Sequence, residues 1–186
     1  MKKGLLLIIV LLLAITAGCG GDGDNADVKI SIYPRGGQPE DFAQNLQDVL
    51  QKEPALDGIS ISVWGNSLYN ASKLMVDMAA SDYSIYILSK DDFVNYMRQG
   101  GGIELEEWYS PDDYPSGVVE LVDFGKGNEI IYTGEKHLYG LPVNNSRAVK
   151  EAGFEPQEEW FAVIHPGADD MEKTRKVLDV LAQPSS

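Results

Sequence analysis

The fold class is decided by residues 28–99, where three strand-like segments alternate with amphipathic stretches. The strand-like segments read VKISI at 28–32, ISISV at 59–63 and SIYIL at 84–88. Apolar residues at helical spacing follow each of them, within 42–50, within 71–79 and over 91–99. A strand and helix in alternation, three times over, is typical of an open, mostly parallel sheet with helices on both faces. We therefore predict an α/β fold built on a single sheet of this kind.

The pattern of apolar and polar residues changes after Glu104, where a loop-like stretch precedes shorter apolar segments. An apolar stretch covers 118–124, and the segments 130–132 and 136–141 predict a short hairpin around Thr133-Gly134-Glu135. A short helix over 146–152, a late strand over 161–164 and a final amphipathic helix within 171–181 follow. These elements join the first ones in a predicted single α/β domain, residues 28–183.

The chain begins with the pattern of a secretory signal. Lys2 and Lys3 precede an unbroken apolar run over 5–13, and small residues then lead to Cys19, the sole cysteine of the chain. A charged start, an apolar core of about 7–15 residues and a small-residue cleavage site define a signal peptide. A transmembrane helix needs about 20 apolar residues, so the stretch 4–18 is too short for one.

We therefore predict a lipoprotein signal peptide at residues 1–18, a lipidated Cys19, and a flexible tether over 19–27. The tether is rich in glycine and aspartate, which favours a flexible coil. Acyl chains on Cys19 would hold the domain at the cell membrane, on its extracytoplasmic side.

The charge balance narrows the range of partners. The chain has 29 acidic residues against 15 lysines and arginines, a net charge of −14. Cleavage after residue 18 removes two lysines and no acid, so the mature charge is −16. Such acidity argues against nucleic acid as a partner, because nothing neutralises its phosphates, and against binding of anionic lipid through a polybasic segment. Because lipidation consumes the one thiol, no disulfide is expected and packing must hold the domain together.

Three short motifs follow one another in an order shared with a known class of lipoproteins. The first is the Cys19 motif with its acidic spacer and strand 28–32. The second is DYSIYIL at 82–88 followed by GIEL at 102–105, and the third is LYGLPV at 138–143 followed by EAGF at 151–154 and Trp160. Together they resemble the extracellular solute-binding lipoproteins of ABC importers, chiefly the sugar-binding type.

The resemblance implies the fold of one lobe of a periplasmic binding protein and a non-enzymatic binding function. Members of the class have two lobes, each about 100–200 residues long. The resemblance therefore implies a chain reduced to a single lobe, which offers half of a clamshell site.

The sequence contains no recognisable catalytic or metal-binding motif. His137 and His165 have no metal-ligand spacing around them, and neither a nucleophile elbow nor a P-loop occurs. The acidic pairs Asp91-Asp92, Asp112-Asp113 and Asp169-Asp170 are typical of helix starts and solvated loops. We therefore predict no enzymatic activity, no cofactor and no metal.

A ligand site is predicted where strands end, because ligands of open α/β sheets bind beyond the carboxyl ends of the strands. Arg35 follows the first predicted strand, and Trp64, Asn66 and Tyr69 follow the second. Trp64 and Tyr69 could stack on a sugar face, while Arg35 and Asn66 supply hydrogen bonds. In the alternative interpretation, Trp64 caps the core and Gly65-Asn66-Ser67 forms a turn.

The leading hypothesis is a membrane-anchored, non-enzymatic binding protein. The alternative is an accessory lipoprotein that docks another envelope protein. A concave face with converging polar groups would favour the first, and a flatter, more apolar face the second. The expected partners are the membrane, through the acyl chains on Cys19, and a carbohydrate or an envelope protein.

Overall fold

The protein is described from a computed structural model that covers residues 25–65, 67–127 and 129–185. The predicted signal peptide, Cys19 and Asn66 lie outside these residues. The strands are β1 (Val28–Tyr33), β2 (Ile61–Gly65), β3 (Ile85–Ser89), β4 (Val118–Phe124), β5 (Ile130–Leu138), β6 (Gly140–Pro142) and β7 (Trp160–Ile164). The helices are α2 (Phe42–Gln51), α3 (Ala71–Ala80), α4 (Lys90–Met97), α5 (Arg147–Glu151) and α6 (Met171–Ala182), with 3₁₀ turns η1 (Pro54–Leu56) and η2 (Pro115–Gly117).

The main sheet has the strand order β2-β1-β3-β7-β6. Strand β1 pairs in parallel with both β2 and β3, while β7 runs antiparallel to β3 and to β6. Strand β7 therefore runs against the other four strands. The prediction of an α/β fold with a single open, mostly parallel sheet is confirmed.

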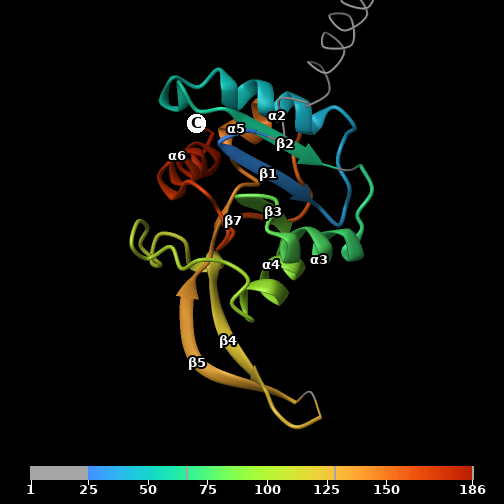
Figure 1. Ribbon diagram of the computed structural model, residues 1–186, viewed down its shortest axis with the longest axis vertical. Helices are drawn as coiled ribbons and strands as arrows, with labels where there is room; N and C mark the ends of the chain where they lie inside the picture. Colours follow the sequence, from blue (N-terminus) through green and yellow to red (C-terminus); the bar gives the residue numbers. More distant parts are fainter. Residues whose placement is uncertain (1–24, 66, 128, 186) are drawn as a thin grey trace, which may run out of the picture.

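Helices cover both faces of this sheet (Figure 1). Helices α2, α5 and α6 share one apolar core with Ile30 and Ile32 of β1, Ile87 of β3 and Ala162 of β7. Helices α3 and α4 share a second core with the opposite face, where Phe93 of α4 stacks on Phe161 of β7 at a ring-centroid distance of 4.3 Å. Each large apolar side chain buried in these layers contributes about 1.5–3 kcal/mol to folding.

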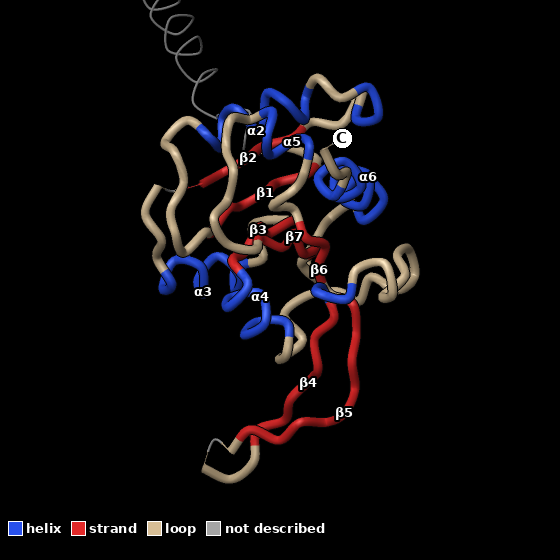
Figure 2. The backbone as a smooth tube through the Cα atoms, turned by 180° about the vertical axis from the view of Figure 1, so that it is seen from behind, coloured by secondary structure: helices blue, strands red, loops and turns tan. Residues whose placement is uncertain are grey.

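Strands β4 and β5 form a two-stranded ribbon that projects away from the sheet (Figures 1 and 2). This corrects the predicted hairpin, which was placed around Thr133-Gly134-Glu135. Those residues lie inside β5, where the register shifts opposite Glu120 to Val122. Gly134 adopts a φ of +83°, the left-handed conformation that a β-bulge uses readily. The glycine marks a bulge, and the actual turn lies between Phe124 and Ile130.

The Tyr-Gly-Leu-Pro passage has a different role from the predicted hairpin strand. Residues 140–142 form β6 and pair with β7 in the main sheet. No helix within the described residues is long and apolar enough to cross a membrane.

Candidate functional site

The carboxyl ends of β1 and β3 meet where the chain changes direction across the sheet. From β1 the chain passes through α2 to β2 on one side, whereas β3 lies on the other side of β1. Connections that diverge in this way leave a crevice, the usual ligand site of open α/β sheets. Arg35 follows β1 at this point, and α4 begins directly after β3.

Asp92, in the first turn of α4, organises the polar groups at this crevice. It is buried, and Arg35 donates to both of its oxygens, from Nε to Oδ2 at 3.1 Å and from Nη2 to Oδ1 at 2.6 Å. The Tyr69 hydroxyl also donates to Oδ1, at 3.1 Å, and the Ser89 hydroxyl donates to Oδ2, at 3.3 Å. Two-point hydrogen bonding between a guanidinium and a carboxylate is strong and directional, so Asp92 fixes the position of Arg35.

The Arg35 guanidinium also lies near the Tyr69 ring, 5.7 Å from its centroid, within cation–π range. The hydrogen bond to Asp92 raises the pKa of Arg35, so the guanidinium stays charged. Burial first, and then the hydrogen bond to Asp92, raise the pKa of the Tyr69 hydroxyl. The group therefore presents a fixed cation beside a neutral phenol at neutral pH.

Beside this group lies a half-open hollow of about 590 Å³ between α3 and α4. That volume falls within the range of about 300–1,000 Å³ that is common for small-molecule sites. Its lining includes Arg35, Tyr69, Met75, Asn95, Tyr96 and Gln99. Two tyrosine rings and a thioether supply apolar contact, while a guanidinium and two amides supply directional hydrogen bonds.

The structure brings together two of the four ligand residues that were predicted. Arg35 and Tyr69 share the carboxylate of Asp92 and line the same hollow. Trp64, which is 47% exposed, lines a separate hollow of about 340 Å³ along the free edge of β2. Trp64 therefore does not cap the core, and it does not join Arg35. The predicted role of Asn66 concerns a residue outside the described ones.

The sequence reasoning missed Asp92 and Tyr96. Asp92 was interpreted as an ordinary acid at a helix start, and it does lie in the first turn of α4. The signal that could have identified it is its place directly after the β3 strand, at a carboxyl end where ligand sites form. Tyr96 is one helical turn further along α4 and so faces the same side as Asp92.

A second polar cluster lies under α3, around the buried carboxylate of Asp77. The Tyr33 hydroxyl donates to Asp77, and the Lys73 ammonium donates to the same oxygen, Oδ2, at 2.5 Å. Burial and then the hydrogen bond to Asp77 raise the pKa of Tyr33 to about 12. The Tyr86 hydroxyl donates to the Asp77 backbone carbonyl at 2.7 Å. These bonds tie α3 to β1 and β3, which is a structural role.

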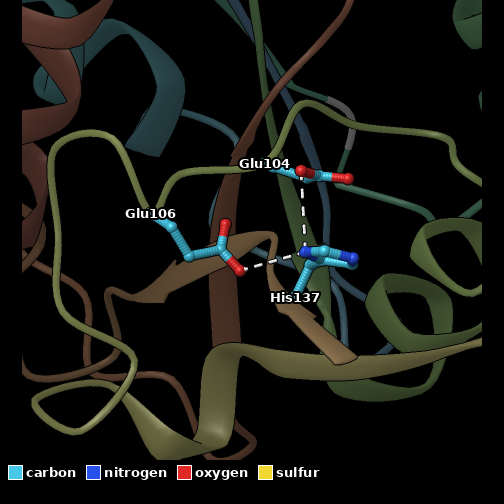
Figure 3. A group of neighbouring side chains, drawn as sticks. All are labelled: Glu104, Glu106 and His137. Carbon is cyan, nitrogen blue, oxygen red and sulfur yellow. Dashed lines mark ion pairs between the residues drawn. The ribbon is translucent and has the colours of Figure 1, made fainter. Parts of the chain in front are cut away.

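One group within the described part of the chain has the donors to hold a metal ion. Glu104, Glu106 and His137 each offer a ligand atom, and these atoms lie within 4.8 Å of one another (Figure 3). None of the three lines the hollow between α3 and α4.

Comparison of the chain with models of protein families, with characterised proteins and with solved structures finds no match.

Proposed function

We propose that this chain is a lipid-anchored, extracytoplasmic binding protein without enzymatic activity, and that its ligand binds in the hollow between α3 and α4. The observation that carries the proposal is the position of this hollow at the carboxyl ends of β1 and β3, beside the Arg35–Asp92–Tyr69 group. The signal-like start and Cys19 support the anchor. The resemblance to one lobe of the sugar-binding lipoproteins supports a binding function.

The lining of the hollow favours a hydroxylated ligand such as a carbohydrate. The rings of Tyr69 and Tyr96 offer faces for the apolar side of a sugar ring, and Asn95 and Gln99 offer amide donors and acceptors. Typical small-molecule sites enclose about 70–90% of the ligand surface. A half-open hollow encloses less, so an oligosaccharide or polysaccharide chain, which makes further contacts outside it, is a better fit than a single sugar.

Isothermal titration of the full chain in detergent with carbohydrates of increasing length tests this proposal. We expect affinity to rise with the number of sugar units, and Tyr96→Ala to weaken binding at least about tenfold, or about 1.4 kcal/mol. Trp64→Ala is the matched control, because it removes an exposed aromatic ring from the other hollow and should leave the affinity unchanged. Equal effects of the two variants would locate the site elsewhere.

A specific observation also favours the alternative, an accessory lipoprotein that docks another envelope protein. The β4–β5 ribbon exposes four large apolar side chains near its turn: Phe124, Ile130, Ile131 and Tyr132, between 47% and 63% exposed. An isolated two-stranded ribbon is marginally stable and gains from a further partner. The tip lies at the opposite end of the molecule from residue 25, where the described chain begins (Figure 1). A lipid anchor before residue 25 would therefore hold the tip away from the membrane, which favours a protein partner over lipid.

Crosslinking in intact envelopes, from a photoreactive residue at position 131, tests this alternative. The docking function predicts a discrete protein adduct that Ile130→Ser abolishes, and it predicts no adduct from position 75 in the hollow. Labelling of lipid from position 131 would contradict it.

A further inference from the structure

A second potential site lies where the β4–β5 ribbon joins the domain. Segment 104–106, which follows α4, lies against the end of β5. The Leu105 amide donates to the Leu138 carbonyl at 2.8 Å, and the Leu138 amide donates to Glu106 Oε1 at 2.7 Å. Glu104 precedes a turn that begins at Glu106, and a carboxylate oxygen of each residue lies within 3.5 Å of His137 Nδ1. Figure 3 shows both carboxylates directed at the same ring nitrogen, Nδ1.

The distances from His137 to the two carboxylates are compatible with a shared metal ion. Nδ1 of His137 lies 3.5 Å from Glu104 Oε2 and 3.3 Å from Glu106 Oε1. One ring nitrogen carries at most one hydrogen, so it can donate a full-strength hydrogen bond to only one of the two carboxylates. Ligands about 2.1 Å from a tetrahedral zinc ion lie about 3.4 Å apart, which matches both separations.

Among the ion pairs of the described residues, Glu104 and Glu106 pair only with His137. The nearest basic contact on β5, Lys136, pairs instead with Glu120 across the ribbon, at 3.8 Å. The Leu138 amide orients Glu106 from behind, as outer hydrogen bonds commonly orient metal ligands.

We propose that Glu104, Glu106 and His137 bind a divalent transition-metal ion, for which Zn²⁺ is the natural probe. An imidazole nitrogen with two carboxylates is a donor set that zinc accepts, whereas Ca²⁺ and Mg²⁺ prefer oxygen ligands throughout. The bound ion links segment 104–106 to β5 and so holds the base of the ribbon against the domain. This proposed metal site shares no residue with the hollow between α3 and α4, so the two proposals are independent.

Zinc titration of the untagged full chain in detergent, with calorimetric readout, tests the proposal. We expect one Zn²⁺ per chain with a dissociation constant below about 10 μM, or about −7 kcal/mol. His137→Gln and Glu104→Gln should each weaken binding at least about tenfold. His165 does not compete, because it is buried and its Nδ1 accepts the Gly167 amide at 3.0 Å.

Glu107→Gln is the matched control, since it removes one charge from the same exposed segment and no proposed ligand. It should bind Zn²⁺ as the wild type does. Amide exchange provides a second readout: Zn²⁺ should slow exchange at Leu105 and Leu138 in the wild type and in Glu107→Gln, but not in His137→Gln. A wild-type dissociation constant above about 10 μM, or an undiminished affinity in His137→Gln, would overturn the proposal.

Discussion

At the scale of single residues, the ion pair between Asp92 and Arg35 fixes the position of the charged groups at the candidate ligand site. Only 4% of the Asp92 side chain is exposed, against 41% for Arg35. Loss of a hydrogen bond to a buried charge costs about 1.5–3 kcal/mol, and a buried acid that loses its partner is left uncompensated. Because 41% of the Arg35 side chain is exposed, water screens the ion pair and lowers this energetic cost.

We expect Asp92→Asn to lower the free energy of unfolding by about 1–3 kcal/mol at pH 7. Denaturation in urea measures this value. Asp91→Asn is the control, because Asp91 contacts the same guanidinium at 3.3 Å but its side chain is 71% exposed. Its loss should cost less than about 1 kcal/mol. Equal costs for the two variants would mean that Asp92 does not organise the site.

The raised pKa of Tyr33 predicts that the folded protein loses stability in alkali. Its pKa in the folded protein is raised to about 12, from an ordinary value of 10.0. The unfolded chain therefore releases this proton first, so the stability contribution is complete below pH 10 and is lost as pH rises from 10 towards 12.

Stability curves measured between pH 8 and pH 12 should accordingly fall less steeply in Tyr33→Phe than in the wild type. Tyr132→Phe, at an exposed tyrosine of the ribbon, removes the same hydroxyl away from any buried carboxylate and should keep the wild-type slope. A wild-type slope in Tyr33→Phe would show that burial and the hydrogen bond to Asp77 do not hold the Tyr33 phenol in the neutral form.

At the scale of elements, the ribbon leaves the sheet through a close backbone crossing. A Cβ atom on Gly117 would lie 1.9 Å from the Gly140 carbonyl oxygen and 2.9 Å from Leu138 Cδ1. The Tyr139 amide donates to the Gly117 carbonyl at 3.0 Å. The segment before β4 and the segment after β5 therefore cannot separate without loss of that bond. Only glycine therefore fits at position 117.

Gly117→Ala should destabilise the protein by about 1–3 kcal/mol, the usual cost of overpacking, or more if the hydrogen bond also breaks. Thermal unfolding followed by circular dichroism measures the loss. Gly36→Ala is the control, because its nearest neighbour would lie at 3.7 Å, an ordinary contact. A neutral Gly117→Ala would mean that the crossing adjusts freely.

The sheet could be predicted from the sequence because strand and helix periodicities alternate over residues 28–99 and each requires its own face. The ribbon could not be predicted correctly, since Gly134 has the same local signature in a bulge as in a turn. Strand β1 alternates with serine although it is an inner strand of the sheet, and Ser31 is buried. For the site, strand ends located Arg35 and Tyr69, but long-range pairing brings Asp92 to Arg35 and His137 to Glu104, which no local pattern encodes.

At the scale of the whole molecule, both cores contain residues only from Val28 onward within the described chain. We therefore expect the proposed anchor and the folded domain to be separable. We expect Cys19→Ser to abolish incorporation of a radiolabelled fatty acid and to leave unprocessed precursor, because lipid attachment to the thiol precedes cleavage. Urea denaturation of purified mutant and wild type should give the same midpoint. Undiminished label on the mutant would refute the lipoprotein assignment.

Binding of a carbohydrate in the hollow between α3 and α4 should perturb the residues that line it. The measurement that tests it most directly is nuclear magnetic resonance of the isotopically labelled protein, titrated with an oligosaccharide that binds. We expect shift changes concentrated at Arg35, Tyr69, Asn95, Tyr96 and Gln99, with none at Trp64 or at the tip of the ribbon. Changes confined to Phe124 and residues 130–132, or to the hollow that contains Trp64, would contradict it.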